Sequence, residues 1–304
     1  MGSEHARAST LLGARVSSVC DQEVSRAQAL ASRYPGSAVL KGWQEIEWAS
    51  IDAVFICTPP SCRGPVELAA VRAGVPFFME KPVGVSAEQC LELYRALKAK
   101  PVINSIGYMN RYRTSVLQAW DLIGGAEPIG IICNWVCAPY RVGWWLQPSD
   151  SGGPFNEQAT HFIDLCRFFM GEVVEVSALA RRSNGHAGIN DTVIALLRFA
   201  GGAMATVFYS CRAENKQIGI QIFTASTRVM LEGWDLQLVG HEKNPCQQED
   251  VYLRQDAAFF EAIATGDQSV VRSSLEEALH TQQVVDAIHR SLSIGGPVPV
   301  TRIE

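Results

Sequence analysis

The chain has 304 residues, of which 47% are hydrophobic, and its formal net charge at pH 7 is −5. The length favours two domains, and the composition excludes a disordered chain. The sequence contains no block of Lys and Arg of the kind that nucleic-acid binding requires, and no apolar stretch approaches the roughly 18 residues of a membrane span. We therefore predict two globular domains without a nucleic-acid or membrane partner.

The cysteines number nine, and most of them lie in apolar segments. None forms a C-x-x-C pair, so their spacing favours neither a zinc site nor a disulfide scaffold. Buried, reduced thiols are typical of cytosolic proteins, and the first residues do not resemble a secretory signal. We therefore predict a cytoplasmic protein without a bound metal.

The first third of the chain alternates short apolar runs with helix-like segments. Strands are expected at 14–20, 51–57, 76–79 and 102–106, and helices at 24–34, at 66–73 and from Ser86, where Ser86 and Gln89 match a capping box. Such alternation indicates βαβ units and a parallel, doubly wound sheet. An α/β domain is therefore predicted over residues 1–106.

Asp21 stands at the end of the first predicted strand. In dinucleotide-binding folds an acidic residue at this place accepts hydrogen bonds from the adenosine ribose, about 20 residues after a glycine-rich turn. Gly2 and His5 fit the end of that fingerprint, whereas its first strand and first two glycines would lie before Met1. The alternative is an Asp that merely opens a turn.

The first strand of such a sheet has hydrogen-bonded neighbours on both sides, so its absence would leave unpaired backbone groups in the core. Either the functional chain begins upstream of Met1, or another segment fills the place. We favour the former, and expect the upstream codons to encode an apolar strand followed by G-x-G-x-x.

The motif Glu80-Lys81-Pro82 follows the predicted buried strand 76–79 directly. Ligands of open α/β sheets bind at the carboxyl ends of the strands. Lys81 would therefore point into a crevice, where it could donate a hydrogen bond or a proton to a substrate oxygen. A solvated ion pair between Glu80 and Lys81 is the alternative.

The rest of the chain, 107–304, has a different pattern. Strands are predicted at 129–138, 174–182, 192–199, 203–211, 218–224 and 227–232, and helices at 157–170, 256–265 and 275–293. Short, turn-rich connections indicate an open, mainly antiparallel sheet, so this part is predicted to be an α+β domain. Its helices would cover one face of the sheet, and the other face could meet a partner subunit.

The predicted helix at 157–170 contains a second set of polar residues. Glu157 and His161 are four residues apart and would share one face, and Asp164 could lie near His161. A histidine with a nearby carboxylate is suited to general acid/base chemistry. The alternative is a satisfied, partly buried histidine and an acid placed favourably in a first helical turn. Zinc is not expected, because a third clustered ligand is missing.

Together these motifs resemble the Gfo/Idh/MocA oxidoreductases. The resemblance rests on the order of Glu80-Lys81-Pro82, then the run 107–112 (GYMNRY), Gly152-Gly153, and the run 157–164 (EQATHFID). It implies a Rossmann-type domain followed by an open-sheet domain, with NAD or, less favoured, NADP between them. Asp21 would repel the 2′-phosphate of NADP.

The resemblance also implies roles for individual residues. Lys81 would hydrogen-bond the reacting hydroxyl and relay its proton, with His161 as the matching acid/base and Glu157 orienting substrate or His161. Lys81-Pro82 would be a cis peptide. The residues expected near the cofactor are Gly2, Asp21, Thr58, Pro59, Pro60, Glu80, Lys81 and Arg111. Those expected near the substrate are Tyr108, Asn110, Trp144, Trp145 and Asn156. The two tryptophans could instead serve interdomain packing.

The leading functional hypothesis is an NAD(P)-dependent dehydrogenase or reductase acting on a sugar, polyol or related hydroxy/keto compound. A homodimer or homotetramer formed through the C-terminal sheet is expected. Two alternatives remain at this stage. One is a glycosidase that uses NAD for transient oxidation, and the other is a non-catalytic homologue acting as a binding or assembly subunit.

Overall fold

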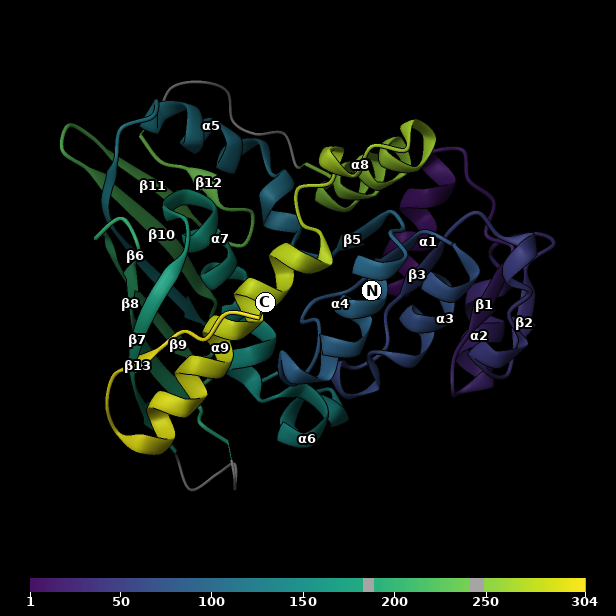
Figure 1. Cartoon of the computed structure of the whole chain (residues 1–304), viewed down its shortest axis with the longest axis horizontal. Helices are drawn as coiled ribbons and strands as arrows, with labels where there is room; N and C mark the ends of the chain where they lie inside the picture. Colours follow the sequence, from purple (N-terminus) through teal and green to yellow (C-terminus); the bar gives the residue numbers. More distant parts are fainter. Residues whose placement is uncertain (183–188, 241–248, 304) are drawn as a thin grey trace.

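The computed structural model describes residues 1–182, 189–240 and 249–303 (Figure 1). Five short strands in the first third of the chain are all parallel to their partners. They are β1 (Ser18–Cys20), β2 (Ala38–Leu40), β3 (Val54–Ile56), β4 (Phe77–Met79) and β5 (Asn104–Ile106). Pairing divides them into a two-stranded sheet, β1–β2, and a three-stranded sheet, β3–β4–β5. The predicted Rossmann-like parallel arrangement is confirmed.

Four helices accompany these strands: α1 (Gly2–Leu11), α2 (Val24–Ala31), α3 (Pro65–Ala73) and α4 (Leu91–Ala99). Four of the five strands were predicted, each shorter than the run that predicted it, whereas β2 was not predicted. The capping box predicted at Ser86 is wrong, because α4 begins five residues later and Gln89 is used elsewhere. The Gln89 side chain accepts a hydrogen bond from the Val85 amide at 2.9 Å and donates one to the Pro60 carbonyl at 2.9 Å.

The second domain is built on an eight-stranded sheet in the order β12-β11-β10-β6-β9-β8-β7-β13. Its strands are β6 (Pro128–Val136), β7 (Val173–Arg181), β8 (Thr192–Phe199), β9 (Met204–Ser210), β10 (Gln217–Thr224), β11 (Arg228–Glu232), β12 (Gln237–Leu238) and β13 (Val298–Pro299). The prediction of a mainly antiparallel open sheet is confirmed. The exception is β6, which enters the middle of the sheet and pairs in parallel with β9.

Helices cover one face of this sheet, on the side toward the first domain (Figure 1). They include α5 (Thr114–Ile123), which the sequence patterns did not predict, α7 (Thr160–Met170) and α9 (Leu275–Ile294). The helix α8 (Val251–Thr265) instead packs against α1. The first turn of α9 also joins the first domain, since Leu275, Ala278 and Leu279 belong to its apolar core. The carboxyl-terminal part of the chain therefore packs against both domains.

Short helical turns fill several connections. They are η1 (Trp43–Glu45), η2 (Trp48–Ser50), η3 (Pro60–Cys62), η4 (Glu88–Cys90), η5 (Met109–Tyr112), η6 (Gly143–Leu146), η8 (Gln268–Val270), the four-residue α6 (Pro148–Ser151) and the π-helical turn η7 (Phe155–Ala159). Among the described helices, none is long and apolar enough to cross a membrane.

The two faces of the large sheet differ in burial. Along β8, Val193, Ala195 and Leu197 are at most 1% exposed and lie in the core, whereas the alternate residues Ile194 and Leu196 are 40% and 52% exposed. This period of two is the expected signature of a sheet with one covered and one open face. The open face carries further large apolar side chains, namely Ile132, Leu179, Met204 and Phe208.

Candidate active site

Lys81 joins the two domains. It follows the fully buried strand β4, and its Nζ donates a hydrogen bond to the Glu157 carbonyl oxygen at 2.7 Å and forms a close ion pair with the Glu157 carboxylate. The two side chains are 13% and 11% exposed. The bond before Pro82 is cis, as the family resemblance implied. The fold thus brings together two predicted catalytic residues that lie 76 positions apart in the chain.

Trp145 holds the other side of the same carboxylate. Its indole Nε1 donates a hydrogen bond to Glu157 Oε2 at 3.0 Å, and its side chain is almost fully buried. Both carboxylate oxygens of Glu157 are therefore engaged, one by an ammonium and the other by an indole. The neighbouring Trp144 is partly buried against the core of the second domain. Within the described residues, Trp145 is the one of the two tryptophans that hydrogen-bonds a predicted catalytic residue.

The backbone around Glu157 is a π-helical turn, which the sequence patterns did not predict. Such turns are rare and frequently occur at functional sites. Gly152 leads into it with φ +73°, and a Cβ at this position would overlap the Asn156 amide. The Asn156 amide donates to the carbonyls of Gly84 at 3.1 Å and Ser151 at 2.8 Å, and its oxygen accepts from Gln282 at 2.9 Å. The predicted substrate residue Asn156 is thus fully buried and bonded within the protein.

His161 lies in the first turn of α7 and is 4% exposed. Its ring is stacked on Trp135, with centroids 5.9 Å apart, and meets the Tyr108 ring edge-on at 6.0 Å. Its buried Nδ1 has no hydrogen-bond partner among the described residues. Burial, and then the positive charges of Lys81 and Arg113, hold the pKa of His161 well below its ordinary value of 6.5. The imidazole is therefore neutral near pH 7, with Nδ1 unbonded within the described residues.

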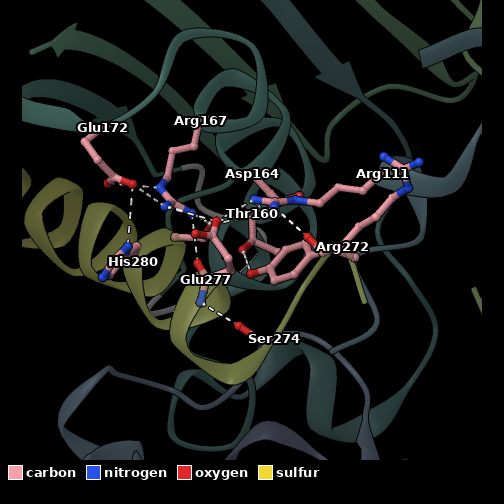
Figure 2. A network of polar contacts seen from close by, with 11 residues as sticks. Arg111, Thr160, Asp164, Arg167, Glu172, Arg272, Ser274, Glu277 and His280 are labelled. Carbon is pink, nitrogen blue, oxygen red and sulfur yellow. Dashed lines mark hydrogen bonds and ion pairs between the residues drawn. The ribbon is translucent and has the colours of Figure 1, made fainter. Parts of the chain in front are cut away.

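Asp164 does not assist His161. Its two carboxylate oxygens accept hydrogen bonds from Arg111 Nε and Nη2, both at 2.8 Å, and a third comes from Thr281 at 3.2 Å. Figure 2 shows this network, in which Arg111 also donates to the Arg272 carbonyl and to Glu277. The hypothesis that Asp164 lies beside the histidine as its carboxylate partner is wrong, because the side chain is bound to η5 and α9.

The polar residues of the run 107–112 are also engaged by the protein. The Tyr108 hydroxyl and Thr160 Oγ1 are 2.7 Å apart, and burial raises the pKa of Tyr108. Asn110 Oδ1 accepts from Arg113 Nε at 2.8 Å. Arg111 is held in the network of Figure 2. The side-chain hydrogen bonds of all three residues are thus made within the protein. Their substrate or cofactor roles remain predictions.

Most of the residues predicted to bind the cofactor follow the carboxyl ends of the parallel strands. Asp21 follows β1, and its Oδ1 accepts from the Glu23 amide at 2.9 Å. Thr58, Pro59 and Pro60 follow β3, with Thr58 Oγ1 3.4 Å from Arg63 Nη1. Gly2 begins α1, where the first backbone amides of a helix have no partner within it. Dinucleotides bind at strand ends and helix starts of this kind in parallel sheets, and contacts of Asp21 and Gly2 with a cofactor remain predictions.

Sequence reasoning missed the roles of two buried charged residues. His5, noted only as part of the fingerprint, contacts Glu80 and Asp256. Arg63 is 4% exposed and donates to the Ile56 carbonyl at 2.8 Å. The position of His5 three residues after Gly2, on the face of α1 that also buries Ala8, was the available signal. Within the described residues, no cluster of His, Cys, Asp and Glu is arranged to hold a metal ion.

Both domains match models of a known protein family. Residues 1–108 match the model described as "Oxidoreductase family, NAD-binding Rossmann fold", and residues 129–230 match the "GFO/IDH/MocA C-terminal domain". The chain belongs to the Gfo/Idh/MocA oxidoreductase family. The predicted resemblance is therefore confirmed, and the first domain is the NAD-binding domain of this family.

Individual relatives agree with this assignment. An inositol 2-dehydrogenase of Rhizobium meliloti is 33% identical over 229 residues, which cover 70% of this chain and 66% of that protein. Inositol 2-dehydrogenase 1 of Saccharopolyspora erythraea is 26% identical over 99% of this chain and 93% of its own length. A putative myo-inositol dehydrogenase from Sinorhizobium meliloti, solved as a crystal structure, is 26% identical with a TM-score of 0.84, covering 99% and 96% of the two chains.

A levoglucosan dehydrogenase solved with NADH and levoglucosan shares the fold. Its TM-score is 0.87 over 100% of this chain and 97% of the other, at 20% identity. Likeness at this level of identity establishes the arrangement of elements and leaves the substrate of the present protein to be argued from its own residues.

Proposed function

We propose that this protein is an NAD-dependent dehydrogenase or reductase of a sugar or polyol, with Lys81 and His161 handling the proton of the reacting hydroxyl. The observation that carries the proposal is the contact of Lys81 with Glu157 beside a buried, neutral His161. A lysine and an unprotonated histidine are both side chains that can move a proton to and from an alcohol, and the carboxylate orients the lysine.

A bound NAD would supply the acceptor for the hydride of the substrate carbon. The residues of the chain orient the substrate and move its hydroxyl proton. Lys81 Nζ hydrogen-bonds the reacting oxygen and stabilises its developing negative charge. Neutral His161 takes the hydroxyl proton, so in the reverse direction it returns that proton. Glu157, fixed by Trp145, holds the Lys81 ammonium in place.

The substrate class rests on the relatives. Several named inositol 2-dehydrogenase match most of this chain, and inositols are cyclic polyols. We therefore infer a cyclic polyol or sugar, with NAD preferred over NADP because Asp21 would repel a 2′-phosphate.

The test is NADH formation by the purified protein with a panel of inositols, levoglucosan and common sugars. Lys81→Ala and His161→Ala should each lower kcat by about 100- to 10,000-fold, the usual contribution of a positioned acid or base. If both act on one hydroxyl, the double variant should be scarcely slower than either single variant. Lys98→Ala, which removes an exposed lysine paired with Glu276, is the control and should behave as wild type.

Thermal unfolding and NADH titration should show that the two site variants fold and bind cofactor. Near-normal turnover in either variant would remove that residue from the mechanism. Cleavage of glycosides without net NADH formation would instead indicate the glycosidase alternative.

We also propose that the open face of the eight-stranded sheet joins two copies of the chain. Leu179, Ile194 and Phe208 are cross-strand neighbours on β7, β8 and β9, and Leu196 and Met204 lie nearby on β8 and β9. All five are between 39% and 72% exposed. A contiguous apolar area of this kind on a sheet face favours a protein contact over solvent.

A further inference from the structure

His5 lies at the centre of a buried charged cluster behind Lys81. It is 1% exposed, on the inner face of α1. Its Nε2 is 3.0 Å from Glu80 Oε1, and its Nδ1 is 3.0 and 2.9 Å from the two carboxylate oxygens of Asp256. The rings of Phe78 and Phe55 flank the imidazole, with centroids at 4.6 and 5.2 Å. One side chain thus links α1, the end of β4 and α8.

The hydrogen-bonding pattern defines the charge of this imidazole. A neutral imidazole donates one hydrogen bond and accepts one, whereas an imidazolium donates two. With a carboxylate on each nitrogen, two donors are needed. Burial opposes the charge, but the hydrogen bonds to Asp256 and Glu80 outweigh it and raise the pKa of His5 to about 9. Beyond the two carboxylates, the titratable group facing the ring is Tyr252 of α8, edge-on at 6.2 Å.

Glu80 connects His5 to the backbone of Lys81. While Oε1 faces His5, Oε2 accepts a hydrogen bond from the backbone amide of Lys81 at 3.1 Å. The carboxylate occupies a slot that Gly107 leaves open, since a Cβ at that position would lie 2.7 Å from Glu80 Oε2. Burial raises the pKa of Glu80, but the contacts with His5 and then the charge of Lys81 prevail and lower it. The carboxylate is therefore ionised and held at both oxygens.

Resting on the proposed function, we propose that His5 is a positioning residue for Lys81. Its imidazolium fixes the Glu80 carboxylate, and Glu80 fixes the Lys81 backbone in the conformation that delivers Nζ to Glu157. The hydrogen bonds of His5 within the described residues go to Glu80 and Asp256 and not to Lys81 Nζ or Glu157, so it acts through Glu80.

The test compares wild type with His5→Gln, which removes the cation, and with His5→Lys, which keeps one. Arg7→Gln is the control, because Arg7 lies on the same helix but is 40% exposed and pairs with Glu4 and Asp250. His5→Gln should lower kcat by about 10- to 100-fold with little change in KM, since a small misplacement of a catalytic group can cost about 100-fold. His5→Lys should recover part of that loss.

The pH profile distinguishes positioning from a general effect on stability. Wild-type kcat should fall as His5 loses its proton near pH 9. In His5→Lys this fall in kcat should occur at higher pH, and in His5→Gln it should be absent. A His5→Gln variant that folds and keeps kcat within twofold of wild type would overturn the inference.

A second measurement needs no turnover. Hydrogen–deuterium exchange of the Lys81 amide should become about tenfold faster in His5→Gln, and stay unchanged in Arg7→Gln, because the amide loses a fixed acceptor. Nitrogen NMR of wild type should show His5 protonated on both nitrogens at pH 7. A neutral His5, or unchanged exchange at Lys81, would contradict the inference. These two measurements do not depend on turnover. Failure to oxidise any substrate of the panel would contradict the proposed function alone.

Discussion

Replacement of Arg111 by alanine should destabilise the protein strongly. Arg111 makes a two-pronged ion pair with Asp164 at 2.8 Å, and the two side chains are only 6% and 1% exposed. Removing one partner of a buried pair leaves an uncompensated charge and typically costs about 3–5 kcal/mol. Thr281 still donates to Asp164, so we expect the lower end of this range, about 3 kcal/mol, or roughly a 100-fold fall in the folded-to-unfolded ratio.

The assay is urea unfolding followed by tryptophan fluorescence and circular dichroism. Arg198→Ala is the matched control, because Arg198 pairs with Glu175 on the surface, where the side chains are 56% and 41% exposed, and such pairs contribute at most about 1 kcal/mol. Asp164→Asn should also destabilise, since it removes the charge that Arg111 faces. If Arg111→Ala costs no more than Arg198→Ala while weakening NADH binding tenfold, Arg111 is a cofactor ligand, and the reasoning from burial fails.

Three further predictions concern charge and surface. Because the pKa of His5 is raised from 6.5 to about 9, its contribution to stability is complete below pH 6.5 and is lost as the pH rises through 9. The shift corresponds to about 3 kcal/mol. Between pH 6 and 10, the free energy of unfolding measured in urea should therefore fall by about 3 kcal/mol more in wild type than in His5→Gln. An equal fall in the two proteins would refute this. Asp21→Ser should improve NADP binding relative to NAD by about tenfold in titrations, and an unchanged ratio would exclude Asp21 from cofactor choice. The double variant Leu196→Lys, Met204→Lys should be a monomer by light scattering. Ile294, which is exposed at the end of α9, provides the control, and Ile294→Lys should leave assembly unchanged. Unchanged assembly of the double variant would place the contact elsewhere.

Local patterns were enough to predict the two domains and most of their strands. Apolar runs ended by Gly and Pro predicted parallel strands such as β4, and consecutive strand-like runs with short, turn-rich connections predicted β8 and β9. The same patterns placed Lys81 at a strand end and His161 on a helix. These features depend on nearest neighbours in the chain, so the sequence carries them directly.

Other features depend on contacts between distant residues. The partner of Asp164 is Arg111, 53 positions away, although helical spacing alone favoured His161. The parallel pairing of β6 with β9 and the π-helical turn at Glu157 likewise arise from the packing of the whole domain. His5 could not be assigned a role, since its partners lie 75 and 251 positions along the chain.

The central claim is hydride transfer from a polyol or sugar carbon, and isotope labelling tests it most directly. The protein would be given NAD and a substrate from the panel, such as an inositol, that carries deuterium on its oxidisable carbons. The account predicts NADH that contains one deuterium at C4 of the nicotinamide, formed by wild type and not by Lys81→Ala or His161→Ala. NADH formed without deuterium, or no NADH from any polyol or sugar by a protein that binds NAD, would contradict it.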